Sequence, residues 1–136
     1  MEKYHYLVIG GTFDHLHLGH RRLLDQAFSI ADQVEIGLVK SRRLLAKKKY
    51  QEQIETYHNR KKSLLNYLKT KHYLIRATII PLEDIYGNTL KDQKPEAILV
   101  TDLTLTNALK INSERRKKGY SELKIIIAII QKDNKG

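Results

Sequence analysis

The sequence feature that most constrains the fold is a glycine-containing stretch near the N-terminus, set between an apolar run and a helical pattern. The apolar run is Tyr6-Leu7-Val8-Ile9, and the stretch that follows reads Gly10-Gly11-Thr12-Phe13-Asp14-His15-Leu16-His17-Leu18-Gly19-His20. Apolar and basic residues then recur at helical spacing at Arg22, Leu23, Leu24, Ala27 and Phe28. This order predicts a strand, a tight turn and a helix. Because glycines allow close approach of a ligand and a helix N-terminus attracts anions, the stretch suits phosphate chemistry.

Strand and helix patterns alternate along the rest of the chain, which is typical of an α/β domain with a parallel sheet and right-handed crossovers. Four further strands are expected over 33–39, 73–80, 97–100 and 123–130, the second of them stopped by Pro81. The last is a nearly unbroken β-branched run, as in a strand covered on both faces. Helices are expected over 52–70 and after a cap at Thr104 or Thr106, with Gly119 as the stop of the latter. The sequence therefore predicts one domain over residues 1–136, with a five-stranded parallel sheet flanked by helices.

Ligands of such open sheets bind beyond the carboxyl ends of the strands, where the strand order reverses. We therefore expect residues 10–20 to lie beside residues 101–112. The net charge of +10, from 25 basic and 15 acidic residues, favours nucleotides, acidic metabolites or nucleic acid as ligands. The absence of cysteine excludes disulfides and thiolate metal sites. No run is long enough to span a bilayer and no secretory signal is present, so a cytoplasmic location and no membrane partner are expected.

The order Gly-Gly-Thr-Phe-Asp and then His-x-Gly-His, over residues 10–14 and 17–20, resembles the signature of the HxGH nucleotidyltransferases. Two further stretches are similar to the archaeal and eukaryotic type of phosphopantetheine adenylyltransferase. They are Ile-Pro-Leu-Glu-Asp-Ile-Tyr-Gly at 80–87 and Ala-Leu-Lys-Ile-Asn-x-x-Arg-Arg-x-x-Gly at 108–119. The resemblance implies a Rossmann-like nucleotidyltransferase fold and the transfer of an adenylyl group from ATP to 4′-phosphopantetheine. The products are dephospho-coenzyme A and pyrophosphate, in a step of coenzyme A biosynthesis.

The same resemblance implies ligands and residue roles. ATP and 4′-phosphopantetheine are the expected substrates, dephospho-coenzyme A or coenzyme A the product ligands, and Mg²⁺ the cofactor, with no metal ligand from protein side chains. The implied catalytic residues are His20, which donates to the α-phosphate, Thr12, which places the attacking phosphate, and Lys48, chosen from 47–49 to bridge the reacting phosphates. The implied nucleotide-binding residues are Gly10, Gly11, Thr12, Phe13, His17, His20, Thr101, Asp102, Asn112, Arg115 and Arg116. The implied acceptor-binding residues are Thr12, Lys48, Leu82, Asp84 and Tyr86.

Such a transfer proceeds by direct in-line attack, because positioning and positive electrostatics supply the catalysis without a covalent intermediate. Family members continue after the fifth strand into a Ser/Thr-rich motif that grips the ATP phosphates, and residues 132–136 depart from that pattern. From this departure we expect a domain that lacks the motif and binds ATP less tightly.

Other interpretations stay open at this point. His15, His17 and His20 could ligate zinc, while Asp14 is expected to support the turn through backbone N–H groups. A glycerol-phosphate cytidylyltransferase or an FMN adenylyltransferase would share the first motif. A non-catalytic domain that binds nucleotides or nucleic acid would use the positive charge without turnover, although no nucleic-acid-binding motif is present. The oligomeric state is also left open.

Overall fold

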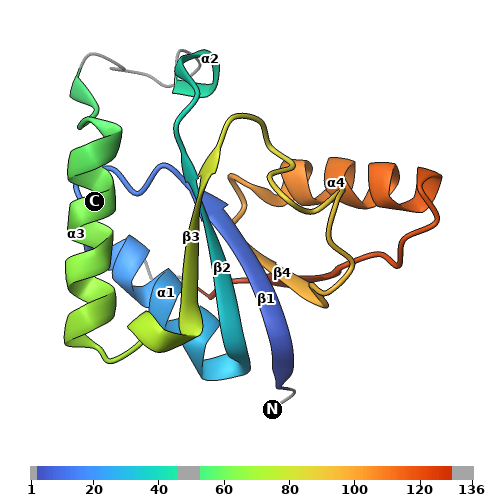
Figure 1. The fold of residues 1–136 in the computed structure, drawn as a ribbon, viewed down its shortest axis with the longest axis horizontal. Helices are drawn as coiled ribbons and strands as arrows, with labels where there is room; N and C mark the ends of the chain where they lie inside the picture. The colour runs from blue at the N-terminus through green and yellow to red at the C-terminus, as the bar shows by residue number, and fades with distance from the viewer. Residues whose placement is uncertain (1–2, 46–52, 130–136) are drawn as a thin grey trace.

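Five parallel strands form the centre of the molecule, and their order reverses once (Figure 1). The computed structural model describes residues 3–45 and 53–129. The sheet has the order β3-β2-β1-β4-β5. Its strands are β1 (Tyr4–Gly11), β2 (Ala31–Val39), β3 (Ala77–Leu82), β4 (Ala97–Val100) and β5 (Lys124–Ile127). The expected five-stranded parallel α/β fold is confirmed, and the reversal between β1 and β4 marks the place where a ligand site is expected.

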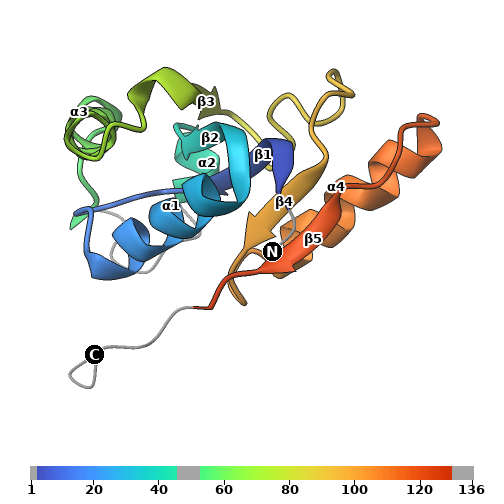
Figure 2. The same ribbon diagram turned by 90° about the horizontal axis from the view of Figure 1, so that it is seen from below.

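The helices divide between the two faces of this sheet (Figure 2). Helices α1 (Leu18–Ile30) and α3 (Tyr57–Thr70) cover one face, and α4 (Leu105–Lys117) covers the other face beside β4 and β5. Leu7 and Ile9 of β1 belong to the core on the α1/α3 side, while Ile98 and Val100 of β4 pack against Ile111 of α4. Because α4 reaches only part of its face, the sheet surface over β1, β2 and β3 is left to the segment that follows β3.

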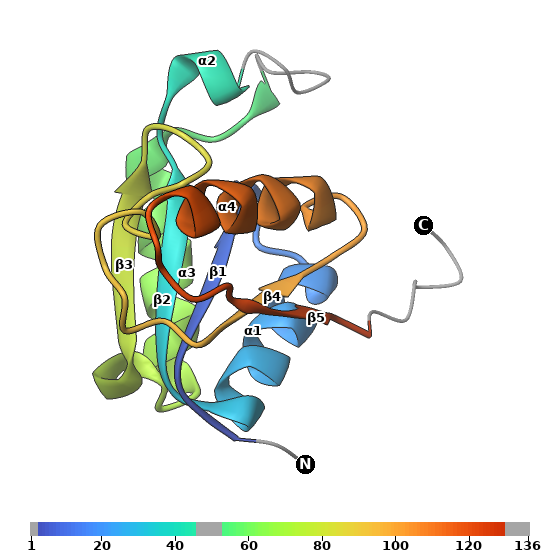
Figure 3. The same ribbon diagram turned by 90° about the vertical axis from the view of Figure 1, so that its right-hand side faces the viewer.

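The carboxyl ends of the strands gather the connecting segments (Figure 3). The short helix α2 (Arg42–Leu45) follows β2 at this end, where the loop after β3 also lies. Backbone N–H groups of Lys40 and Ser41 both donate to the carbonyl oxygen of Leu82, at 2.9 and 3.2 Å. Within the described residues, no helix has the length and apolar character needed to cross a membrane.

Two of the predicted strands were wrong in their limits. The expected strand over 73–80 is a 3₁₀ helix, η2 (Leu74–Arg76), followed by β3, which runs through Pro81 to Leu82. β3 is an edge strand, and the carbonyl of Leu82 faces β2. Because backbone groups of successive residues face opposite sides, the nitrogen of Pro81 faces the open edge, so its lack of an N–H costs no hydrogen bond between the strands. The expected strand over 123–130 is confined to Lys124–Ile127. It lies at the other edge with Ile127 exposed, so it is not covered on both faces.

The helices also differ from expectation at their N-terminal ends. The helix expected from residue 52 begins at Tyr57, because the Thr56 hydroxyl accepts from the N–H of Asn59 and caps it there. Helix α4 follows Thr104 as predicted, but the Thr104 hydroxyl accepts from the N–H of Thr101 rather than from its own helix. Gly119 has a positive φ of 79° and ends this helical segment as expected.

Candidate active site

The turn between β1 and α1 presents two histidines at a helix N-terminus. His17 is the N-cap of α1, and its Nδ1 accepts from the N–H of Gly19 at 3.1 Å. The N–H of His17 in turn donates to Nδ1 of His20 at 3.3 Å, which completes a capping box made of two histidines. Since Nδ1 is the acceptor in both rings, the proton of each neutral imidazole lies on Nε2, where it can serve an anion.

The two imidazoles form one stacked unit. Their ring centroids are 3.7 Å apart, and the planes differ by 18°. The buried ring of Phe13 supports the unit from the core side, with its centroid 5.3 Å from that of His20. Phe13 has a φ of 50°, an unusual conformation for a large residue and one that often marks a functional turn.

The hydroxyl of Thr12 lies just before this unit. Its Oγ1 is buried, and it has no hydrogen-bond partner among the described residues. A buried hydroxyl without a hydrogen-bond partner is unfavourable, because it has lost its hydrogen bonds to water. A ligand oxygen that accepts a hydrogen bond from it at this turn offsets that free-energy cost. The carbonyl oxygen of Thr12 is held by Nη1 of Arg60 at 2.9 Å, which fixes the turn against α3.

Asp14 ties the same turn to the start of α3. Its Oδ1 accepts from the N–H of Glu55 at 2.8 Å, and its Oδ2 lies 2.9 Å from Nδ1 of His15. The N–H of His15 donates to the Glu55 carboxylate at 2.7 Å. The expected support of the turn by Asp14 is confirmed, although the N–H group belongs to a distant segment. The three side chains could approach one cation, but their atoms already hold the loop together.

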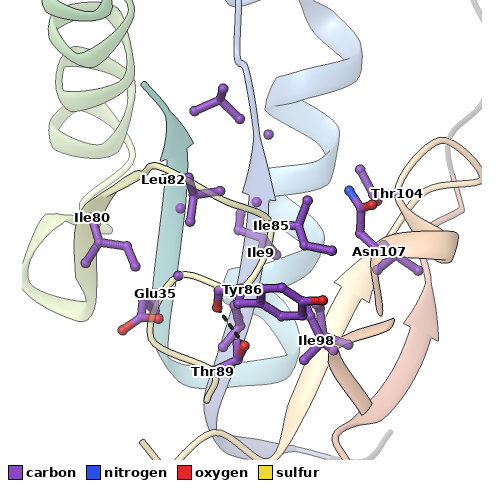
Figure 4. A pocket seen from close by; sticks show the side chains of 18 of the residues that line it. Ile9, Glu35, Ile80, Leu82, Ile85, Tyr86, Thr89, Ile98, Thr104 and Asn107 are labelled. Carbon is purple, nitrogen blue, oxygen red and sulfur yellow. Dashed lines mark hydrogen bonds between the residues drawn. The ribbon is translucent and has the colours of Figure 1, made fainter. Parts of the chain in front are cut away.

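A pocket of about 300 Å³ opens beside the Gly10–Thr12 segment, on the α4 face of the sheet (Figure 4). Gly10 of β1 and Gly37 of β2 are paired in register, so these two strands contribute no side chain to its floor at this level. A Cβ atom on Gly37 would lie 2.8 Å from the side chain of Leu82, which extends from the neighbouring strand β3 and packs over this glycine. The pocket is lined mostly by apolar side chains, together with Thr12, Glu35, Asn88, Thr89, Thr104 and Asn107.

The roof of this pocket is the turn after β3. Asp84 accepts from the N–H groups of Tyr86 and Gly87 at 2.9 and 3.1 Å, and Gly87 has a φ of 53°. The Thr89 hydroxyl donates to the carbonyl oxygen of Tyr86. The structure thus brings Leu82 and Tyr86 into the pocket, whereas the Asp84 side chain shapes the turn that carries them.

The residues expected after β4 divide into two groups. Thr101 is half-buried, its hydroxyl accepts from the N–H of Leu103, and Asp102 is exposed; neither lines the pocket. Asn112 is 5 % exposed, and its amide pairs with the N–H and carbonyl of Leu123 at 2.7 and 2.9 Å. Its side chain therefore joins α4 to the segment before β5.

The two neighbouring arginines are also used within the fold. The guanidinium of Arg115 is buried and donates to the carbonyl oxygens of Thr89, Asp92 and Ser121 at 2.6 to 3.0 Å. Burial lowers the pKa of Arg115 from its ordinary value. Arg116 is exposed and pairs with Glu122 at 2.8 Å. The structure does not bring these two side chains to the pocket, and Lys48 lies outside the described residues.

Three residues near the pocket were missed from the sequence. Glu35 is a charged residue within a predicted strand and Arg60 one within a predicted helix, and such residues are usually solvated. Both are buried, and burial lowers the pKa of Arg60. Asn107 lies five residues before Asn112 in α4 and lines the pocket. The spacing of these two asparagines was the available signal in the sequence. It places them on different sides of α4, so only one of the two can face the pocket.

Comparison with known proteins gives a family match over nearly the whole chain. The model of the cytidylyltransferase-like family matches residues 8–134. The chain is 36 % identical over 136 residues to a phosphopantetheine adenylyltransferase of Methanopyrus kandleri, covering 100 % of this chain and 85 % of that protein. It is 42 % identical over 127 residues to the phosphopantetheine adenylyltransferase of Methanothermobacter thermautotrophicus, covering 91 % and 73 %. A solved structure of a protein of unknown function from Archaeoglobus fulgidus superposes with a TM-score of 0.80 at 28 % identity, over 91 % of this chain and 89 % of that one.

Proposed function

The chain belongs to the cytidylyltransferase-like family and, within it, to the phosphopantetheine adenylyltransferases, and from this premise we propose that it transfers the adenylyl group of ATP to 4′-phosphopantetheine. The products are dephospho-coenzyme A and pyrophosphate. The observation that carries the proposal is the buried hydroxyl of Thr12, a residue that lines the pocket; this hydroxyl has no hydrogen-bond partner among the described residues. The transferases for other acceptors and the non-catalytic binding domain, considered from the sequence, are not favoured by these relatives.

In the proposed reaction, a phosphate oxygen of the acceptor attacks the α-phosphorus of ATP in line with the departing pyrophosphate. The Thr12 hydroxyl donates to the acceptor phosphate and fixes its direction of approach. His20 donates to the α-phosphate, whose charge grows in the transition state, and His17 donates to the ATP phosphates. The positive end of α1 adds to the same field. Lys48 is proposed to bridge the two phosphates, as the family resemblance implies.

The pantetheine arm occupies the pocket in this proposal. The apolar surface formed by Leu82, which packs over Gly10 and Gly37, and by Tyr86 suits a flexible chain of methyl, methylene and amide groups. The nucleotide lies towards the segment after β4, where Thr104 and Asn107 are the polar groups that line the pocket. Asn112 and Arg115 act in this proposal as supports of α4 rather than as phosphate ligands.

Mg²⁺ is proposed to accompany ATP. Bound to the triphosphate, it neutralises charge and favours departure of pyrophosphate. The described residues hold one cluster that could take a cation, at Asp14, His15 and Glu55. This cluster contains an imidazole, whereas Mg²⁺ prefers six oxygen ligands including several waters. We therefore assign no protein side chain to this ion.

We also propose that the reaction takes place in the cytoplasm.

The test is a product assay with the 136-residue chain, ATP, Mg²⁺ and 4′-phosphopantetheine. Release of pyrophosphate together with formation of dephospho-coenzyme A, both abolished by His20→Ala in a folded variant, would establish the function. A parallel panel pairs CTP with glycerol 3-phosphate and ATP with FMN. Turnover of one of these pairs instead of 4′-phosphopantetheine would reject the proposed acceptor. Salt-dependent retention of RNA without any turnover would favour the binding-domain interpretation.

A further inference from the structure

Glu35 is a buried carboxylate in the pocket that the proposed transfer does not use. It lies in the middle of β2, its side chain is 3 % exposed, and it lines the pocket. Figure 4 shows its carboxylate on the side of the pocket away from Thr104 and Asn107. A buried carboxylate is costly unless its oxygens are hydrogen-bonded, so its partners determine what it can do.

Tyr6 supplies one of those partners. The Tyr6 hydroxyl donates to Oε1 of Glu35 at 3.0 Å, and the described residues provide no second hydrogen bond to this carboxylate. Burial and the neighbouring Glu35 charge raise the pKa of Tyr6 to about 12, so its hydroxyl keeps the proton that it donates. An ionised carboxylate has about four acceptor positions, and most of those on Glu35 therefore remain for a ligand.

Glu35 and Thr12 lie at opposite ends of the pocket. Glu35 pairs in register with Val8 of β1, and Thr12 follows Val8 by four residues along the same strand direction. A rise of about 3.3 Å per residue puts the two levels about 13 Å apart. Between them the side chain of Leu82 packs over the backbone of Gly10 and Gly37 and lines the pocket. An extended ligand with its phosphate at Thr12 that passes along Leu82 in this pocket reaches the level of Glu35 with atoms well along its arm.

We propose that Glu35 determines acceptor specificity by accepting a hydrogen bond from the distal amide N–H of the pantetheine arm and by repelling acceptors that carry a carboxylate at that position. This inference rests on the proposed function, because it needs the acceptor phosphate at Thr12. The shorter compound 4′-phosphopantothenate ends in a carboxylate where 4′-phosphopantetheine has its distal amide. In a pocket with few polar groups, two facing carboxylates repel strongly, whereas a carboxylate and an N–H group attract.

The experiment measures kcat/KM and, separately, the dissociation constant in the absence of ATP for 4′-phosphopantetheine and for 4′-phosphopantothenate. Wild type is expected to prefer the amide-ended compound by at least about 100-fold. Glu35→Gln removes the charge and keeps the shape, so the preference should fall by at least about tenfold, chiefly through a gain for the carboxylate-ended compound. Tyr6→Phe leaves the carboxylate in place and is the control in which the preference is retained.

A purely structural role for Glu35 would leave the ratio between the two compounds unchanged in Glu35→Gln, and this result would overturn the inference. If Glu35→Gln fails to fold, the double variant Tyr6→Phe with Glu35→Leu replaces both partners together, and it should lose the preference as well. If the wild type binds the two compounds with unequal affinity but releases no pyrophosphate, the proposed function is rejected while the inference about Glu35 is retained. Wild type that binds neither compound, or both equally, would overturn the inference.

Discussion

The buried guanidinium of Arg60 donates to the carbonyl oxygen of Thr12 at 2.9 Å, so a residue of α3 holds the turn that carries the candidate phosphate ligands. The same side chain donates to the carbonyl oxygens of Val39 at 2.7 Å and Glu55 at 3.0 Å. Arg60 therefore joins the ends of β1 and β2 to the segment that leads into α3. Three connections at the carboxyl edge of the sheet depend on one cation that is 1 % exposed.

Replacing Arg60 by methionine should lower the free energy of unfolding by about 2 to 5 kcal/mol, because the buried carbonyl oxygens lose their donor. Urea unfolding followed by circular dichroism measures the change. Arg116→Met is the matched control, since Arg116 is a largely exposed residue with one surface ion pair. Its effect should stay within about 0.5 kcal/mol. Equal effects of the two substitutions would contradict the structural role given to Arg60.

The two asparagines of α4 should respond in opposite ways to substitution. Asn112→Ala leaves the N–H and carbonyl of Leu123 unpaired in the interior and should lower the free energy of unfolding by about 2 to 4 kcal/mol. Asn107→Ala removes an amide that lines the pocket. It should raise KM for ATP by about threefold to tenfold, with little effect on the free energy of unfolding. Unfolding curves and steady-state kinetics of both variants separate the two roles. A higher KM with unchanged stability for Asn112→Ala would restore its role as a nucleotide ligand.

The success of the sequence predictions depended on whether a feature is set by local or by distant contacts. The strand, turn and helix from β1 to α1 follow from hydrophobic spacing and glycines, which are local, and they were predicted correctly. The functions of Asn112 and Arg115 depend on partners brought by other segments, such as the carbonyl oxygen of Thr89 that receives Arg115. No local pattern encodes that contact. The edge position of β3, which allows Pro81 within the strand, depends likewise on the order of the whole sheet.

Stability should fall with alkaline pH because two tyrosines share one carboxylate oxygen. Tyr67 and Tyr73 both donate to Oδ1 of Asp25, at 2.7 and 2.9 Å. Burial and the hydrogen bond to Asp25 raise the pKa of Tyr73 from 10.0 to about 12. Between these values the unfolded tyrosine has lost its proton while the folded one keeps it. Its contribution to stability is therefore complete below pH 10 and is lost as the pH rises towards 12.

Urea unfolding of wild type and of Tyr73→Phe at several pH values from 7 to about 11 measures this loss. The two proteins should show the same pH dependence between pH 7 and 8, where neither the folded nor the unfolded tyrosine titrates. Above about pH 10 the wild type should lose stability more steeply, because the variant has no phenol at this position. Parallel curves over the whole range would show that Tyr73 does not carry the effect.

The Thr12 hydroxyl should matter for catalysis and not for folding. Thr12→Val removes a buried hydroxyl that has no partner among the described residues, so the free energy of unfolding should stay the same or rise by up to about 1 kcal/mol. The same change removes a donor to a charged phosphate, so kcat/KM for 4′-phosphopantetheine should fall about 10- to 100-fold. Thr12→Ser keeps the hydroxyl and is the control that retains most of the activity. Unfolding curves and initial rates of the three proteins test both parts. A destabilised Thr12→Val would mean that the hydroxyl has a partner within the fold, and full activity of that variant would remove Thr12 from the proposed chemistry.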